Sequence, residues 1–381
     1  MPLTDPTNRK MRAITASSCC GVISSRERIA NVKMSLLVIF GAGASYDSIN
    51  PRWFPDKRPT ERFDRINYFR PPLARELFED RRNFNLAVAD YPQSQARITE
   101  LRLRTVQRGD FNVERELEQI KQSAATYPPA LVELAAIQFY LRRIIGECGG
   151  NWQAESNGLT NYRWLLSRID RWRYPDNKVI LVTFNYDYML EMALQGHTTS
   201  IVFNEIGEYI ARDDYKVIRP HGAVTWGQYF QEHATTEGSE RYIIEHAADL
   251  HLSSEFLINQ NAVVNGRLVS PALAIPVEGK SDFACPPEHI TTLVHGMKDV
   301  THVLIVGWRA SEGRFLDNLK EGGLADKRIL IVANDQKDAE KTKENLVGTR
   351  SITHPDFVTC SPRPGFSAFL EDDDLEAFLR L

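Results

Sequence analysis

The feature that most constrains the fold is a short apolar run that breaks into small residues. Residues 36–40 read Leu-Leu-Val-Ile-Phe, and residues 41–47 continue as Gly-Ala-Gly-Ala-Ser-Tyr-Asp. A buried strand followed by side-chain-poor backbone lets main-chain N–H groups approach a diphosphate, with the dipole of the next helix aimed at the same charge. Tyr46 stands where a G-x-G-x-x-G fingerprint has its third glycine. The segment therefore predicts a dinucleotide cradle that departs from the usual pattern.

Composition limits the classes of protein that this chain can belong to. Its 381 residues suffice for one large α/β domain with an insertion or for two modest domains. The net charge of -4 gives no general reason for direct nucleic-acid binding. No stretch approaches a membrane span, and the beginning lacks the apolar core of a secretory signal, so we expect a cytoplasmic protein. The 5 cysteines include no C-x-x-C pair, so no zinc ribbon is predicted.

The order of apolar and polar segments predicts the organisation of the chain. Residues 1–34 are polar and are expected to form a tail or assembly arm, and 35–381 to form the main domain. Five prolines in the loop 50–72 are typical of a mobile cover. From 73 to about 150, apolar residues recur at spacings of three and four, which predicts a helical insertion with Asn112 capping one helix.

Buried strands are expected to alternate with helices along the rest of the chain. The helices are expected to follow Asn185, Ser311 and Asp335, and residues 227–266 are expected to form loops and small strands over one end of the sheet. The expected strands are 36–40, 178–183, 215–219, 302–306 and 328–333. This alternation predicts an α/β fold with a Rossmann-like, doubly wound parallel sheet.

Polar residues follow several of these strands, at the edge where open α/β sheets bind ligands. Residues 182–187 read Val-Thr-Phe-Asn-Tyr-Asp, so the amide of Asn185 and the carboxylate of Asp187 are expected to face one cleft. The alternative is an N-cap with a first-turn acid on the following helix.

A second polar turn, Arg219-Pro220-His221-Gly222, holds His221 between a proline and a glycine. A loop histidine of this kind is either a free base or a surface or capping residue. Two later strands end in a glycine turn at 307–311 and in Asn334-Asp335, whose side chains can hydrogen-bond a ribose.

In this order the strand ends resemble those of the sirtuin family and of its relatives in bacterial anti-phage defence. The resemblance implies that NAD is bound as a substrate, with its diphosphate on the first turn, its nicotinamide ribose beside Asn185 and its adenosine half on the last two strand ends. It assigns catalysis to Asn185, Asp187 and His221. It assigns NAD binding to Gly41, Ala42, Gly43, Ser45, Asp47, Phe184, Gly307, Arg309, Ser311 and Asn334.

Departures from the deacylases of that family favour a different activity. The chain has no pair of C-x-x-C motifs after His221, Phe184 replaces the usual Gln, and a helical block separates the first two motifs. These features resemble the defence branch, which hydrolyses NAD. A module that senses NAD or an ADP-ribose signal, or a protein deacylase or ADP-ribosyltransferase, remains an alternative. Trp308 and Arg309 also replace small residues on the adenosine side.

The chemistry implied is cleavage of the bond between nicotinamide and ribose. The nicotinamide ring of NAD is already a cation before it leaves, so it needs no protonation. The residues must stabilise an oxocarbenium-like centre and present water, and no metal is expected. His221 is suited to accept a proton because imidazole has an ordinary pKa of about 6.5. Uncontrolled NAD cleavage would kill the cell. The resemblance therefore implies a homo-oligomer that works with a separately encoded partner, such as a hexameric HerA-type ATPase.

Overall fold

The computed structural model describes residues 34–50, 69–107, 113–124, 126–173, 177–197, 200–233, 239–275, 283–348, 352 and 354–380. The expectations for the tail before residue 34, for most of the loop 50–72 and for Asn112 therefore lie outside the described residues.

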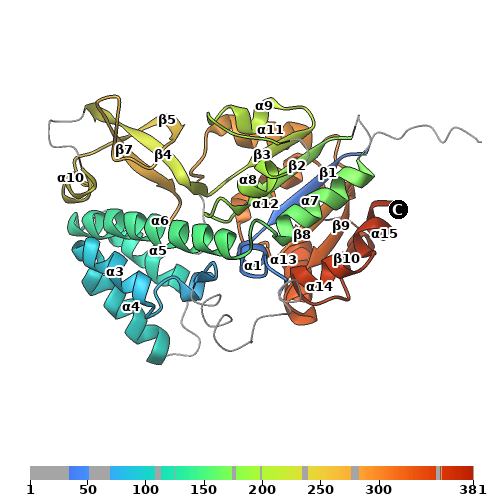
Figure 1. Cartoon of the computed structure of the whole chain (residues 1–381), viewed down its shortest axis with the longest axis horizontal. Helices are drawn as coiled ribbons and strands as arrows, with labels where there is room; N and C mark the ends of the chain where they lie inside the picture. The colour runs from blue at the N-terminus through green and yellow to red at the C-terminus, as the bar shows by residue number, and fades with distance from the viewer. Residues whose placement is uncertain are drawn as a thin grey trace, which may run out of the picture. The chain divides into compact units, whose positions relative to one another are not determined.

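A parallel sheet with strand order β10-β9-β8-β1-β2-β3 forms the centre of the fold (Figure 1). Every neighbouring pair in it is parallel. Its strands are β1 (Leu36–Phe40), β2 (Val179–Thr183), β3 (Tyr215–Ile218), β8 (His302–Val306), β9 (Arg328–Val332) and β10 (Val358–Cys360). The five strands expected from the apolar runs are confirmed, and β10 was not predicted.

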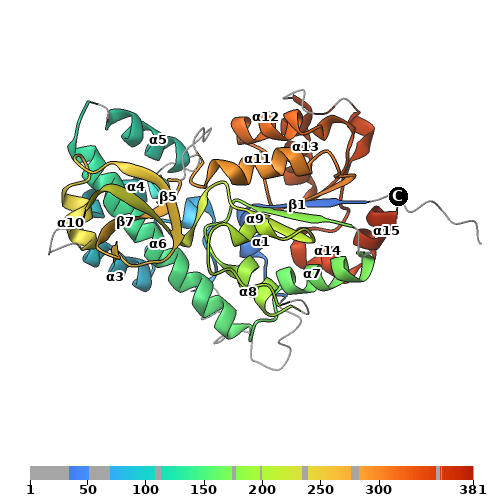
Figure 2. The same ribbon diagram turned by 90° about the horizontal axis from the view of Figure 1, so that it is seen from above.

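Helices cover both faces of this sheet, which confirms the doubly wound prediction (Figure 2). Val38 and Phe40 pack under one layer of helices, while Leu37 and Ile39, which alternate with them, pack under the other. The first layer contains α7 (Asn161–Trp172), α8 (Met189–Gln195), α14 (Gly365–Glu371) and α15 (Asp374–Arg380). The second contains α11 (Pro287–Gly296), α12 (Gly313–Glu321) and α13 (Gln336–Gly348).

Further helices lie in the described part of the chain between residues 69 and 155. They are η2 (Ala74–Glu76), α3 (Arg82–Asp90), η3 (Pro92–Ser94), α4 (Gln95–Gln107), α5 (Val113–Ser123) and α6 (Pro129–Glu155). Their shared core includes the stacked rings of Phe78 and Tyr140. No helix in the described part of the chain is both long and apolar enough to cross a membrane.

A second, antiparallel sheet lies between β3 and β8 in the chain, with the order β5-β4-β7-β6. It consists of β4 (Gly222–His233), β5 (Leu252–Ile258), β6 (Val263–Val264) and β7 (Arg267–Leu273), with α10 (Glu240–Glu245) between β4 and β5. Phe230 and Leu268 pack into the same cluster as Ile144 of α6. The short strands expected at 227–266 therefore exist, but they form a sheet of their own that packs on α6. Short elements complete the chain: α1 (Ala42–Tyr46), α9 (Glu208–Ala211), η4 (Leu324–Asp326) and η5 (Pro355–Phe357).

Two buried histidines make the stability of this fold depend on pH. Burial lowers the pKa of His289 and of His302 to about 4 each. The unfolded chain binds protons below about pH 6.5 that the folded chain accepts only near pH 4, so the free energy of unfolding falls as the pH drops through this window. We expect a loss of about 2 kcal/mol per histidine between pH 7 and pH 5.

Urea unfolding at the two pH values measures this loss. The variant His289→Gln should remove about half of the pH-dependent part. The control His251→Gln should leave it unchanged, because that side chain is 70% exposed. An equal pH dependence in His289→Gln and in the native chain would contradict the assignment.

Candidate functional site

The residues predicted to act together follow strands that end level with one another. Phe40 is in register with Thr183 on one side and with Val306 on the other. Val182 is in register with Ile218. The strand order reverses its direction between β1 and β8, which makes this the topological switch point of the sheet. Ligands of open α/β sheets bind at such a point, outside the carboxyl ends of the strands.

Two glycine turns touch at the switch point. Gly41 N donates to Val306 O (3.0 Å) and Gly43 N to Gly307 O (3.3 Å). A Cβ atom on Gly41 would lie 2.4 Å from Gly307 O, and Gly307 itself has φ +63°. The close approach of the two backbones therefore requires these glycines. Helix α1 has only 5 residues, so the helix dipole expected here belongs to a single turn.

The loop after Gly307 is strained. Ala310 is not glycine, yet it has φ 54° and is buried. Non-glycine residues in this region of backbone space cost free energy and concentrate at functional sites. Ala310 is therefore a strained position in the loop 307–311, beside the first turn.

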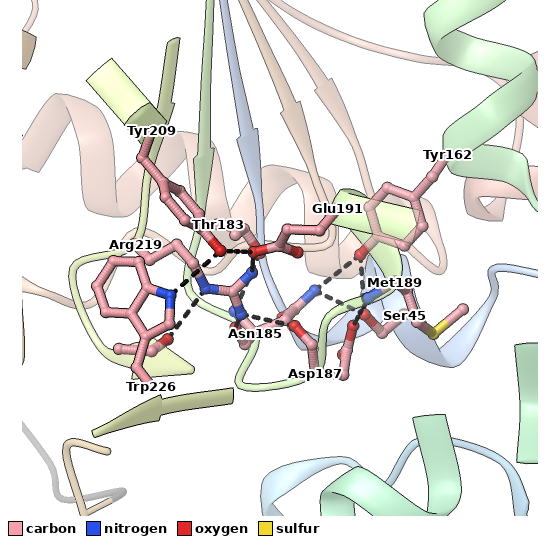
Figure 3. Close-up of polar contacts among 11 residues, drawn as sticks. Ser45, Tyr162, Thr183, Asn185, Asp187, Met189, Glu191, Tyr209, Arg219 and Trp226 are labelled. Atoms are coloured by element: carbon pink, nitrogen blue, oxygen red, sulfur yellow. Dashed lines mark hydrogen bonds and ion pairs between the residues drawn. The ribbon is translucent and has the colours of Figure 1, made fainter. Parts of the chain in front are cut away.

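Ser45, Tyr162 and Asn185 form a buried polar triangle (Figure 3). Asn185 Nδ2 donates to Ser45 Oγ (2.8 Å) and to Tyr162 OH (2.9 Å), and the two hydroxyls lie 2.8 Å apart. Burial and the nearby Asp187 carboxylate raise the pKa of the Tyr162 phenol, so it stays protonated. Asn185 Oδ1 is buried and has no hydrogen-bond partner among the described residues. Buried acceptors are usually hydrogen-bonded, and none of the described residues supplies a donor to this oxygen.

Asp187 closes the turn that begins α8. Its Oδ1 accepts from Met189 N (3.0 Å), and the residue is 5% exposed. The N-cap of α8 is Tyr188 and its first-turn acid is Glu191, so Asp187 holds the turn before the helix and is not the first-turn acid that the sequence left open as an alternative. A Cβ atom on Gly149 of α6 would lie 3.4 Å from Asp187 Cβ, so α6 passes beside the carboxylate. The turn therefore lies between the parallel sheet and the helical insertion.

A fully buried guanidinium joins this segment to the histidine turn. Arg219 Nη2 donates to Asn185 O (2.5 Å) and Asp187 O (2.6 Å), and its Nε donates to Gly222 O (3.2 Å). Its Nη1 pairs with Glu191 Oε1 (2.5 Å). Burial opposes the positive charge, but Glu191, Tyr209 and Asp187 together outweigh it, and the pKa of Arg219 lies above its ordinary value. Arg219 therefore fixes three backbone carbonyls from two of the predicted catalytic segments.

The Glu191 carboxylate is itself hydrogen-bonded to buried aromatic residues. Tyr209 OH donates to Glu191 Oε1 (3.1 Å), and Trp226 Nε1 donates to Tyr209 OH (3.1 Å). Figure 3 shows these groups in one connected chain that leads from Trp226 to Arg219. Because Tyr209 and Trp226 are buried, the ion pair is shielded from water on this side.

His221 lies in a turn whose backbone is fixed on several sides. His221 O accepts from Ala274 N (3.0 Å), and Pro220 O accepts from Ala284 N (2.8 Å). The imidazole ring lies 4.8 Å from the Phe184 ring and 6.2 Å from the Tyr186 ring, measured between centroids. His221 is 2% exposed. The contacts of this segment thus alternate: Phe184 and Tyr186 contact the histidine, whereas Asn185 contacts Ser45 and Tyr162.

Aromatic rings wall the site on the side of the second glycine turn. Phe184 stacks on Trp308 with centroids 5.2 Å apart and an interplanar angle of 4°. Phe315 meets both rings edge to face. Trp308 Nε1 donates to Glu312 Oε2 (2.7 Å), which holds the indole in place. The bulky residue that replaces a small one at 308 is therefore part of this wall.

The other predicted NAD-binding residues are exposed or have hydrogen-bond partners outside the polar triangle. Asp47 accepts from Ser367 N (2.9 Å) and Ser367 Oγ (2.6 Å) at the start of α14. Ser311 N and Oγ both donate to Glu312 Oε2 (3.2 Å). Three more are exposed at the carboxyl edge, namely Ala42, Arg309 and Asn334. No group of three or more metal-ligating side chains occurs in the described ranges.

Sequence reasoning gave no role to Tyr162, Glu191 or Arg219. The only signal for Arg219 is a charged residue placed directly after the apolar strand 215–218. Tyr162 belongs to an amphipathic helix on which nothing local distinguishes it from a core residue. Their roles depend on partners that the fold brings from other segments.

Comparison with protein-family models finds no match, and no curated protein matches. The chain is similar to several solved structures of Sir2 proteins. One is a Sir2 homologue mutant with 2'-O-acetyl ADP ribose: 12% identity, 91% of this chain and 92% of that chain covered, TM-score 0.40. A complex of Sir2 with a p53 peptide and NAD+ has 11% identity, coverage of 90% and 93%, and a TM-score of 0.36.

Proposed function

We propose that the carboxyl edge of the parallel sheet binds NAD and hydrolyses the bond between nicotinamide and ribose. The observation that carries this proposal is the buried acceptor Asn185 Oδ1, which follows β2 beside Ser45 of the first turn and has no hydrogen-bond partner among the described residues. A hydroxyl of the nicotinamide ribose, or the water that attacks it, supplies the missing donor. The resemblance of the strand-end motifs to those of NAD-consuming enzymes supports the same assignment.

The reaction needs a hydrogen-bond acceptor for the ribose or the water, a negative charge beside the ribose, and a base that takes a proton from the water. The bond from ribose C1′ to nicotinamide nitrogen breaks, and its electron pair neutralises the cationic nicotinamide as it leaves. Asp187 offsets the positive charge that develops on the ribose. A water oxygen then bonds to C1′ and gives its proton to the imidazole of His221. Nicotinamide and ADP-ribose are the products.

Preorganisation by Arg219 supports this division of roles. The guanidinium holds the carbonyls of Asn185, Asp187 and Gly222 within 3.2 Å. The amide, the carboxylate and the histidine turn therefore keep fixed relative positions before substrate arrives, which lowers the reorganisation that the reaction requires. We assign the diphosphate to the turn containing Gly43 and Ser45, and the adenosine half to Arg309 and Asn334.

Comparing variants with matched controls tests the proposed roles. We expect Asn185→Ala to lower the rate of nicotinamide release by about 10²-fold or more. His221→Ala should lower it by about 10²- to 10⁴-fold. The exposed residues Asn204 and His251 supply the controls, and Asn204→Ala and His251→Ala should retain the native rate. Chromatography of the products after incubation with NAD measures each rate.

Each negative outcome has a distinct meaning in this experiment. Release that survives both Asn185→Ala and His221→Ala would remove the proposed site. ADP-ribose binding without any release would favour a sensing module, and release that requires an acylated peptide would favour a deacylase.

An NAD-hydrolysing protein also needs control, because free activity depletes a cofactor on which the cell depends. We propose that the chain acts in anti-phage defence as a homo-oligomer with a separately encoded partner such as a hexameric HerA-type ATPase. Full activity from a monomer at micromolar concentration, with no partner added, would argue against this control.

A further inference from the structure

Tyr162 reaches the polar triangle from α7, a helix that covers one face of the parallel sheet (Figure 3). The preceding residue, Asn161, ties this helix to the first glycine turn. Its N donates to Ser48 O (2.7 Å), and its Nδ2 donates to Asp47 O (2.6 Å). The Tyr162 ring packs edge to face against Phe40, with centroids 5.0 Å apart. These contacts fix the Tyr162 hydroxyl beside the turn.

The three contacts of the triangle determine which way the Asn185 amide faces. The side-chain atoms of Ser45, Tyr162 and Asn185 lie 2.8, 2.8 and 2.9 Å apart, so three hydrogen bonds need three donated protons. With Nδ2 in the triangle, the amide supplies two protons and one hydroxyl supplies the third. With Oδ1 in its place, only the two hydroxyl protons are available, and one contact would join two acceptors. The triangle therefore requires Nδ2 and leaves Oδ1 outside it.

The Tyr162 phenol is what makes the two orientations of the amide unequal. A serine hydroxyl accepts from an N–H as readily as it donates to a carbonyl, so Ser45 alone would admit both orientations. The turned amide would present donors where the proposed reaction needs an acceptor. The phenol adds two contacts that only one orientation satisfies together. A difference of one hydrogen bond corresponds to about tenfold in the ratio of the two orientations.

We infer that Tyr162 is a positioning residue, which holds the Asn185 amide with its Oδ1 available to the substrate. Among the described residues, the Tyr162 hydroxyl hydrogen-bonds only to Ser45 and Asn185, so it acts through these side chains. Tyr162 is 1% exposed, and the low dielectric of a buried site strengthens both contacts. The inference rests on the proposed function, because it assigns a further role in the same reaction.

Steady-state kinetics of Tyr162→Phe test the role in the reaction, because this substitution removes the hydroxyl and keeps the ring. We expect kcat for nicotinamide release to fall by about tenfold. KM for NAD should change less than about twofold, because the other contacts to NAD stay in place. The matched control is Tyr140→Phe, which removes a buried hydroxyl that donates to Leu77 O (2.9 Å) in the core of the helical insertion. This control should retain the native kcat.

Exchange of the Asn185 side-chain amide protons with deuterium tests the orientation without any turnover of NAD. NMR of the full chain labelled with ¹⁵N-asparagine follows this exchange, and Asn185→Ala identifies the signal by its loss. In the native chain both protons are expected to be protected, because each is donated to a buried hydroxyl. Exchange should be at least about tenfold faster in Tyr162→Phe and native in Tyr140→Phe.

The two measurements distinguish failure of this inference from failure of the proposed function. A native chain that releases no nicotinamide contradicts the proposed function, and amide exchange then still tests whether Tyr162 orients Asn185. A purely structural role would lower the melting temperatures of Tyr162→Phe and Tyr140→Phe alike and leave kcat unchanged in both. Native amide exchange in Tyr162→Phe, or a native kcat in Tyr162→Phe when the unsubstituted chain is active, overturns the inference.

Discussion

Replacing Arg219 with methionine is expected to lower the free energy of unfolding by about 3 to 5 kcal/mol. The substitution leaves the Glu191 carboxylate without its cation in a region where Arg219 itself is 0% exposed. It also removes the donor from the carbonyls of Asn185, Asp187 and Gly222. Equilibrium unfolding in urea measures the change.

The control is a variant that breaks a solvent-exposed ion pair between an arginine and a carboxylate. Arg212→Met breaks the contact with Asp214, but the Arg212 side chain is 43% exposed, so the expected loss is below about 1 kcal/mol. Adding Glu191→Leu to Arg219→Met should recover part of the stability, since no unpaired buried charge then remains. Equal losses in Arg219→Met and Arg212→Met would show that the buried guanidinium does not organise the site.

The second large effect is expected from Gly222→Ala. Gly222 has φ +74°, and a Cβ atom there would lie 1.8 Å from Ala272 O, a backbone atom that cannot turn aside. Backbone strain and this collision together should cost about 3 kcal/mol or more, and should displace the neighbouring His221.

Gly266 separates these two contributions. It has the same φ of +74°, but nothing lies within 4 Å of its Cβ position. Gly266→Ala should therefore cost only the strain, about 1 to 2 kcal/mol. Thermal unfolding of both variants gives the difference, and similar losses would contradict the steric explanation.

Much of the parallel sheet was predictable because its strands are short apolar runs bounded by small or polar residues. Strand β10 was missed because Val358–Cys360 is only 3 residues long and includes a polar threonine. The antiparallel sheet was recognised only as short strands, since its partner surface on α6 comes from a distant part of the chain.

Site residues were predictable where the chemistry lies in a local motif, and not where it depends on distant partners. Asn185 and Ser45 were singled out at separate strand ends, and the fold joins them by a hydrogen bond of 2.8 Å. Tyr162 completes that cluster from a helix whose local sequence carries no signal. Asp47 shows the opposite case: its carboxylate accepts from Ser367, which is 320 positions away. No local pattern distinguishes such a cap from a ligand-binding acid.

Turnover of NAD in ¹⁸O-labelled water tests the central claim most directly. Hydrolysis at the switch point predicts equal amounts of nicotinamide and of ADP-ribose carrying one ¹⁸O atom at C1′, with Asn185→Ala close to the background rate. The chain should be assayed alone and with the proteins encoded beside it. Absence of labelled ADP-ribose under both conditions, or an unchanged rate in Asn185→Ala, would contradict NAD hydrolysis at this site.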